Sequence, residues 1–366
     1  MKRLMLVAAA AITLAAPLGA SAHDEGGPDL THLPIGDGKL STAPKRGYIW
    51  ACHVDPQAGG AFRNGPWIHS DGTYDFTRKA VVSGHVNWPS RYAIALAGDR
   101  RTFTTNDLPS HATGTFPIPA TDEAYQYDRN PNSIRTQDFD FDLPANPTLA
   151  ASPTCAPGAV GILITGSVLF NSLDAPGRDA VAHETQDACQ GHPQEGGVYH
   201  YHSVSTCIDD KRLPDGHSAL VGYALDGFGI FGRYGEGGKL LSSADLDECH
   251  GHVHAIPWDG KMVVMYHYHA TWDFPYTIGC MRGAYSMASM LKVSGVGQGP
   301  GGAGRGGQDG PGGQGPMPDL GAAAAKLGIS QDKLMQALGP PPPDLAAAAA
   351  KLGVSEPQLK AALGVP

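Results

Sequence analysis

Basic residues are scarce in this chain, which carries 26 Lys and Arg against 35 Asp and Glu and a formal charge of −9. Without Lys2 and Arg3 the charge would be −11. Nucleic-acid binding needs a basic face that neutralises phosphates, so the composition gives no support to a nucleic-acid partner. After the N-terminus no segment approaches about twenty apolar residues, which argues against a membrane span.

Several familiar catalytic motifs are also missing. The chain has no G-x-S-x-G elbow and no G-x-x-x-x-G-K phosphate loop. The segment HETQD, residues 183–187, ends in Asp where the zinc-protease pattern H-E-x-x-H requires His, and its surroundings are not helical. We therefore set a protease aside and keep Glu184 and Asp187 as groups that could support metal ligands.

The N-terminus has the pattern of a secretory signal peptide over residues 1–22. Lys2 and Arg3 precede an apolar run, which ends in the small residues Ala20-Ser21-Ala22. We expect a periplasmic or extracellular protein. Cleavage after Ala22 would expose His23, whose amino group and imidazole could chelate Cu(II), although a plain polar arm over residues 23–45 is the simpler interpretation.

Six cysteines in an exported chain predict three disulfides, because that compartment is oxidising. Sequence alone allows fifteen pairings, and thiolate ligation of a metal is the alternative. The six are Cys52, Cys155, Cys189, Cys207, Cys249 and Cys280.

Residues 46–293 predict one mainly β domain, of sandwich or barrel-like architecture. Short β-branched or aromatic runs such as AVGILITGSVLF alternate with Gly, Pro, Asn and Asp clusters, and helical periodicity is scarce. In QDFDFDLP, Asp138, Asp140 and Asp142 would share one strand face. That pattern could supply calcium ligands, but a half-buried edge strand protected by charge is favoured.

The C-terminal part has a different composition. Residues 294–317 are Gly-rich and predict a flexible linker. Residues 318–366 contain two 25-residue repeats, each predicted to form two short helices with Ser330 or Ser355 capping the second. We expect this tail to dock a protein partner.

The tetrapeptide Tyr-His-Tyr-His occurs twice, at residues 199–202 and 266–269. Alternation along a strand places His200 and His202 on one face, and likewise His267 and His269. Each pair is followed by a cysteine and preceded by Cys-x-Gly-His, which adds His192 and His252 as candidate ligands. Two arrangements are open. The four paired imidazoles converge on neighbouring strands, or the two halves are similar hairpins on opposite sides of the domain.

These motifs, together with HSALVGYALDGFGIFG and DLDECHGHVH, resemble the YHYH-domain family of exported bacterial proteins over about residues 155–285. The resemblance implies a metal-binding domain without a settled activity. Its pattern falls on the cysteines and histidines named above and also on His217 and Asp226. Asp226 could orient a histidine or merely form an Asp-Gly turn, and His217 could be a ligand or lie exposed. We predict the disulfides Cys189–Cys207, Cys249–Cys280 and, by elimination, Cys52–Cys155.

The leading prediction is a copper- or zinc-binding protein, with a metalloenzyme built on the same site as an extension. Three bound histidines would leave an open position, whereas four would close the site. The alternative is a non-metal binding module whose His and Tyr strands line a groove for a polymer or a cell-envelope ligand, with the helical tail docking a partner. Three or more imidazole nitrogens within about 2 Å of one point would favour the metal.

Overall fold

The computed structural model describes residues 27–55, 59–285, 320–329, 331–338 and 345–363, so the predicted signal peptide, His23 and the predicted Gly-rich linker lie outside the described residues. The fold is mainly β, as predicted. The strands are β1 Leu33–Pro34, β2 Thr73–Tyr74, β3 Val81–Val82, β4 Tyr92–Ala97, β5 Arg100–Thr105, β6 Phe139–Pro144, β7 Leu149–Thr154, β8 Ala159–Leu163, β9 Val168–Phe170, β10 Gln186–Asp187, β11 Gly191–Pro193, β12 Tyr199–Tyr201, β13 Leu220–Ala224, β14 Gly229–Phe231, β15 Gly251–Trp258, β16 Lys261–His269 and β17 Met281–Gly283.

The helices in the described part of the chain are short. They comprise α1 Ala180–His183, the 3₁₀ turns η1 Glu123–Gln126, η2 Glu236–Gly238 and η3 Ser243–Asp245, and the tail helices α3 Leu320–Leu327, α4 Gln331–Leu338, α5 Leu345–Leu352 and α6 Glu356–Leu363. Each 25-residue repeat thus forms two helices, as predicted. None of the described helices has the length and apolar character needed to cross a membrane.

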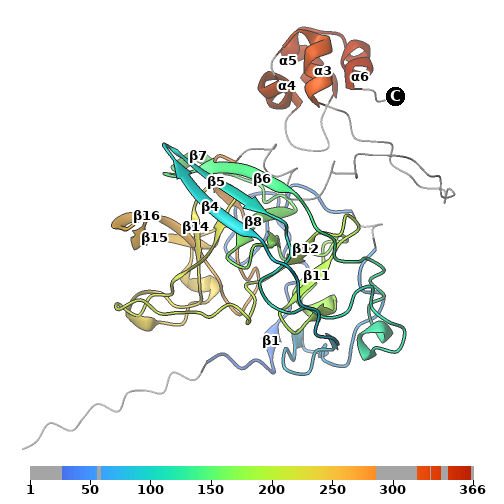
Figure 1. Cartoon of the computed structure of the whole chain (residues 1–366), viewed down its shortest axis with the longest axis vertical. Helices are drawn as coiled ribbons and strands as arrows, with labels where there is room; N and C mark the ends of the chain where they lie inside the picture. Colours follow the sequence, from blue (N-terminus) through green and yellow to red (C-terminus); the bar gives the residue numbers. More distant parts are fainter. Residues whose placement is uncertain (1–26, 56–58, 286–319, 330, 339–344, 364–366) are drawn as a thin grey trace, which may run out of the picture.

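An eight-stranded mixed sheet forms the centre of the β region, in the order β11-β12-β9-β8-β13-β14-β16-β15. A second sheet, β4-β5-β6, lies across it (Figure 1). The contact is aromatic: Phe103 stacks on Phe141 at 5.1 Å and meets the Tyr223 ring edge-on at 5.2 Å. The two sheets therefore pack face to face over an apolar core.

β6 is an edge strand with alternating faces. Phe139 and Phe141 are buried, whereas Asp138, Asp140 and Asp142 are exposed on the other face. Thr102 on β5 donates a hydrogen bond to Asp142 at 2.6 Å. The structure thus agrees with the half-buried edge strand that the sequence favoured.

The eight-stranded sheet contains the same four-strand pattern twice. β8 and β9 are antiparallel, β9 and β12 parallel, and β12 and β11 antiparallel. The strands β13, β14, β16 and β15 repeat this sequence of pairings. Both β8 and β13 carry a register shift at the same point, before Gly161 and Gly222. The duplication seen around the Tyr-His-Tyr-His segments therefore extends over the whole sheet.

Residues 27–45, which we expected to form a polar arm, instead pack on the β domain. β1 pairs with β2, and Leu33 is buried. The Gly36 amide donates to the buried Asp179 carboxylate at 2.8 Å. The Gly and Pro residues of this segment, which suggested disorder, instead allow tight turns as the segment follows the domain surface.

All three predicted disulfides are present: Cys52–Cys155, Cys189–Cys207 and Cys249–Cys280. No described cysteine is free, so thiolate ligation of a metal by these residues is excluded. The last two disulfides each close the segment that carries one Tyr-His-Tyr-His strand, which fixes the chain on both sides of the histidines.

Candidate metal centres

The first Tyr-His-Tyr-His segment forms β12 and brings three histidines together. His192 on the neighbouring strand β11 lies directly opposite His200 in the sheet register. Ring centroids are 4.6 Å apart for His192 and His200 and 4.9 Å apart for His200 and His202. All three side chains are buried, and each offers one nitrogen within 4.8 Å of the others. We call this group the three-histidine centre.

Backbone carbonyls determine which nitrogens in this centre carry protons. His202 Nδ1 donates to the Asn171 carbonyl at 2.6 Å, and His200 Nδ1 lies 3.2 Å from the Val198 carbonyl. A proton on Nδ1 leaves a lone pair on Nε2 in a neutral imidazole. The two Nε2 atoms are 3.2 Å apart, so two lone pairs face each other. A shared cation would make this arrangement favourable.

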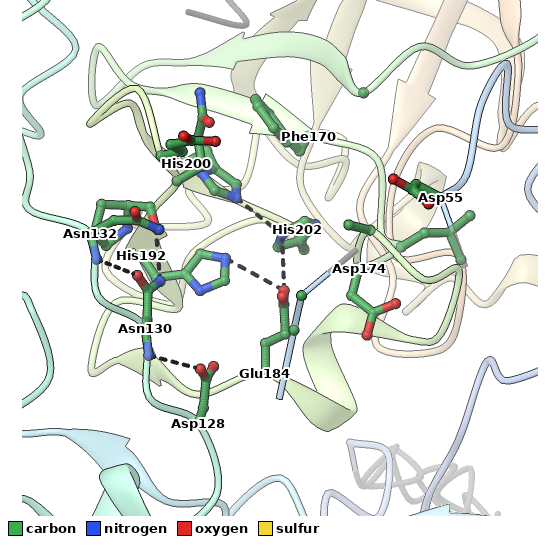
Figure 2. A pocket seen from close by; sticks show the side chains of 18 of the residues that line it. Asp55, Asp128, Asn130, Asn132, Phe170, Asp174, Glu184, His192, His200 and His202 are labelled. Carbon is green, nitrogen blue, oxygen red and sulfur yellow. Dashed lines mark hydrogen bonds and ion pairs between the residues drawn. The ribbon is translucent and has the colours of Figure 1, made fainter. Parts of the chain in front are cut away.

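Glu184 approaches the same point from the end of α1 (Figure 2). Its Oε2 atom lies 3.6 Å from His192 Nε2 and 3.5 Å from His202 Nε2. Among the described residues, Glu184 Oε2 and both ring nitrogens of His192 are buried without a hydrogen-bond partner. Buried polar atoms in folded proteins are nearly always paired. A buried carboxylate beside unpaired imidazole nitrogens is therefore suited to a cation.

The second Tyr-His-Tyr-His segment, on β16, builds a larger group. His252 on β15 lies opposite His267, as His192 lies opposite His200, and His269 completes the equivalent trio. His217, from the segment before β13, adds a fourth ring. The Nε2 atoms of His267 and His269 each lie 3.0 to 3.2 Å from the Nε2 atoms of both His217 and His252. We call it the four-histidine centre.

Three of these four rings again have Nδ1 bound to a carbonyl. The acceptors are Ser218 for His217 at 2.7 Å, Gly232 for His269 at 2.7 Å, and Met265 for His267 at 3.2 Å. The Nε2 lone pairs consequently point into one small space. A point equidistant from four nitrogens with this spacing lies about 2 Å from each, which is the usual zinc–imidazole distance of about 2.0–2.1 Å.

The surroundings hold these imidazoles in the neutral form that binds metals. Burial lowers the pKa of His202 to about 4, and burial together with the neighbouring His252 lowers the pKa of His267 to about 2. Burial also lowers the pKa of His200 and His269 well below the ordinary value. Protons therefore compete weakly with a cation at these sites near neutral pH.

These pKa values predict how acid affects the metal-free protein. Unfolding returns each imidazole to a pKa of about 6.5, so below that pH the unfolded chain binds protons that the folded chain does not. The contribution of His267 to the free energy of unfolding is therefore full above about pH 6.5 and declines as pH falls toward its folded pKa of about 2. Buried Glu184, with a raised pKa, acts in the opposite direction.

The comparison that isolates this contribution is between wild type and His267→Gln. Urea unfolding of both proteins, in EDTA, between pH 7 and pH 4.5 should give a steeper loss of stability for wild type. Equal slopes for the two proteins would show that His267 does not remain neutral in the folded state.

The tyrosines of both segments form a second duplicated network on the opposite strand face. Tyr199 donates to Asp187 at 2.9 Å and Tyr266 to Asp247 at 3.0 Å. Each of these carboxylates also accepts the backbone amide of the cysteine two residues later. We expected half-buried rings with hydroxyls near water, but all four tyrosines are buried and bonded to protein groups. Their role is to fix the strands that carry the histidines.

Two expectations about single residues are corrected. Asp226 does not orient a histidine: it accepts the Tyr268 hydroxyl at 2.6 Å and the Gly283 amide at 2.9 Å. Asp187 likewise bonds Tyr199 and backbone amides instead of a metal-ligand candidate. His183 pairs with Asp37 at 2.8 Å, and α1 ends there, so HETQD lacks the helical geometry of a zinc protease.

Of the two arrangements that the sequence left open, the structure contradicts the convergence of four paired imidazoles on neighbouring strands and agrees with two similar halves that lie apart. Four strands, β9, β8, β13 and β14, separate β12 from β16. With strands about 4.8 Å apart, the two Tyr-His-Tyr-His strands lie well over 15 Å from each other. The candidate ligands divide instead into two groups, with His192 serving the first and His252 the second.

The sequence does not reveal the roles of two residues, His217 and Asp247. For His217, a metal ligand and an exposed turn residue fit the sequence equally well, and only the fold shows that its turn reaches β16. Asp247 was not singled out at all, although a signal existed: Asp187 and Asp247 both stand two residues before the cysteine in the duplicated halves.

Comparison with known families gives one match. Residues 140–240 match the family model described as YHYH protein. The match starts in β6 and ends before β15, so the second Tyr-His-Tyr-His segment lies outside the matched range. No curated protein and no solved structure matches the chain.

Proposed function

We propose that this chain, which carries a YHYH domain over residues 140–240, is a transition-metal-binding protein with two centres. The observation that carries the proposal is the four-histidine centre. Its Nε2 atoms lie 3.0 to 3.2 Å apart with at least three lone pairs directed inward. Without a cation this packing opposes folding, since neither a proton nor a hydrogen-bond donor lies between most of these nitrogens.

Copper and zinc are the metals that fit the donor set. Both bind neutral imidazole, and the affinity order of divalent metals favours copper over zinc at such sites. Magnesium and calcium prefer oxygen ligands, which the four-histidine centre lacks among its converging atoms. Because the cysteines form disulfides and offer no thiolate, imidazole is the main type of metal donor at these centres.

Burial argues against the alternative of a polymer-binding groove. Tyr199, Tyr201, Tyr268 and the four paired histidines are each at most 4% exposed. A groove for an extended ligand needs these side chains at the surface, whereas the histidines and the tyrosines are buried on opposite faces of their strands. The described strands therefore favour an ion over a polymer as the ligand of this region.

We place the protein in the periplasm or outside the cell. Three disulfides are stable in an oxidising compartment and rare in the cytosol. The pattern of the first 22 residues supports the same location. A protein there would meet copper and zinc without competition from cytosolic thiols.

The test is elemental analysis of protein purified from its native export compartment or reconstituted with copper or zinc. Wild type should hold about two metal ions per chain, and His200→Ala and His267→Ala/His269→Ala, each of which leaves two histidines at the altered centre, should each hold about one. His85→Ala, at an exposed histidine outside both centres, is the matched control and should retain both ions. A metal-free wild type that takes up neither copper nor zinc would overturn the proposal.

A further inference from the structure

The two centres share a frame of three histidines. The strand pairings make His192 equivalent to His252, His200 to His267, and His202 to His269. The frames agree in dimension. The His192–His200 and His252–His267 centroid distances are both 4.6 Å, and the His200–His202 and His267–His269 distances are 4.9 and 5.0 Å. What distinguishes the centres must therefore lie outside this frame.

The fourth position is filled in one centre and open in the other. His217 stands three residues before Leu220, and the strand registers make Leu220 equivalent to Ala159. The residue three positions before Ala159 is Ala156, a buried methyl group with no donor atom. The three-histidine centre therefore has no counterpart of His217.

A cavity of about 970 Å³ lies against the three-histidine centre. Its lining includes all three histidines and Glu184 (Figure 2). Gly158 also lines it, from the segment before β8 that is equivalent to the His217 segment before β13. This volume is at the upper end of the range for small-molecule pockets, about 300–1,000 Å³. The missing fourth ligand thus coincides with space large enough for an exogenous one.

Charge restricts which molecules the cavity would accept. Its lining carries the carboxylates of Asp55, Asp128, Glu184 and Glu195, and also that of Asp174, which is paired with Arg178 at 2.8 Å. Arg129 is the only Lys or Arg among the described residues that line the cavity. Glu184 is the carboxylate nearest the imidazoles and has an unpaired buried oxygen. A cation held by the three imidazoles would favour the ionised form of Glu184, so that an anion entering beside it would meet like charge, which is costly where water is scarce.

We infer that the two centres have different roles, an inference that rests on the proposed metal binding. The three-histidine centre keeps an open coordination position that takes a small neutral molecule with a nitrogen or oxygen donor, supplied from the cavity. The four-histidine centre is coordinatively filled and holds its ion for stability. Glu184 selects against anionic ligands at the open position.

The test uses Co(II) in the full-length protein, because its visible spectrum changes when a ligand is added. His267→Gln/His269→Gln leaves only the three-histidine centre, because two histidines remain in the other group, and His200→Gln leaves only the four-histidine centre. His217→Gln/His252→Gln and His192→Gln replace them if either first variant misfolds. Imidazole, as the neutral probe, should change the spectrum of His267→Gln/His269→Gln with saturation and leave that of His200→Gln unchanged.

The outcomes separate the two proposals. If no variant binds Co(II), the proposed metal binding fails. If both variants bind Co(II) but both or neither respond to imidazole, metal binding stands and the division of roles is overturned.

A second measurement addresses Glu184. In the His267→Gln/His269→Gln background, Glu184→Gln should tighten binding of azide by about five- to ten-fold, because a like charge is removed. Its imidazole affinity should change by less than about two-fold. An unchanged ratio of azide to imidazole affinity would show that Glu184 does not select the ligand.

Discussion

Removing the metal from the four-histidine centre is expected to lower the free energy of unfolding by about 4 kcal/mol, when free metal had been held near 1,000 times its dissociation constant. The reason is that the proposed ion would bind the folded arrangement of His217, His252, His267 and His269, which the unfolded chain lacks. Urea unfolding with zinc, compared with excess EDTA, measures the combined loss at both centres in wild type and the loss at this centre alone in His200→Gln.

The matched control for this result is His267→Gln, which should lose most of its response to zinc at this centre. His85→Ala should respond like wild type. If His267→Gln were stabilised by zinc as strongly as wild type, the stabilising ion would have to bind elsewhere. The response of His200→Gln gives a second check, because that variant retains the four-histidine centre intact.

The disulfide Cys52–Cys155 is expected to contribute the largest share of covalent stabilisation. It joins residues 103 apart in sequence, against 31 for Cys249–Cys280 and 18 for Cys189–Cys207. Loop-closure entropy then gives about 4.7, 3.7 and 3.2 kcal/mol respectively. The paired change Cys52→Ser with Cys155→Ser should therefore cost about 4–5 kcal/mol.

Urea unfolding of the three paired Cys→Ser variants in EDTA checks this order, because chelation removes any contribution from the adjacent metal centres. The Cys52–Cys155 disulfide also lies beside a backbone contact that survives reduction, since the Cys52 amide donates to the Ala156 carbonyl at 2.9 Å. A smaller loss for this variant than for the Cys189–Cys207 pair would contradict the entropic explanation.

Much of the local structure was predictable because short-range rules determine it. Alternation correctly placed the paired histidines on one strand face, and the duplicated Cys-x-Gly-His context identified both His192 and His252 and the disulfide partners. The Phe and Asp alternation of β6 was likewise sufficient to recognise an edge strand. These features depend on residues within a few positions of one another.

The features that escaped prediction depend on strand order. Nothing in the two Tyr-His-Tyr-His segments reveals that four strands lie between them, so one shared centre and two separate ones fit the sequence equally well. The same limitation applies to His217, whose approach to β16 requires the β13–β14–β16 arrangement. Residues 27–45 were misjudged because composition does not report burial of Leu33 or the Gly36–Asp179 contact.

The central contact between β8 and β13 has the geometry of a subunit interface. Gly161 pairs with Ala224, Ile162 with Tyr223, and Leu163 with Gly222, so equivalent residues cross about the Ile162–Tyr223 pair. This is the self-complementary pattern that a two-fold axis produces in a homodimer. The two halves of the sheet are thus related as the protomers of such a dimer would be, but within one chain. Two halves of one chain need not be identical in sequence, and here one half carries His217 while the other has Ala156 at the equivalent position and a cavity beside its histidines.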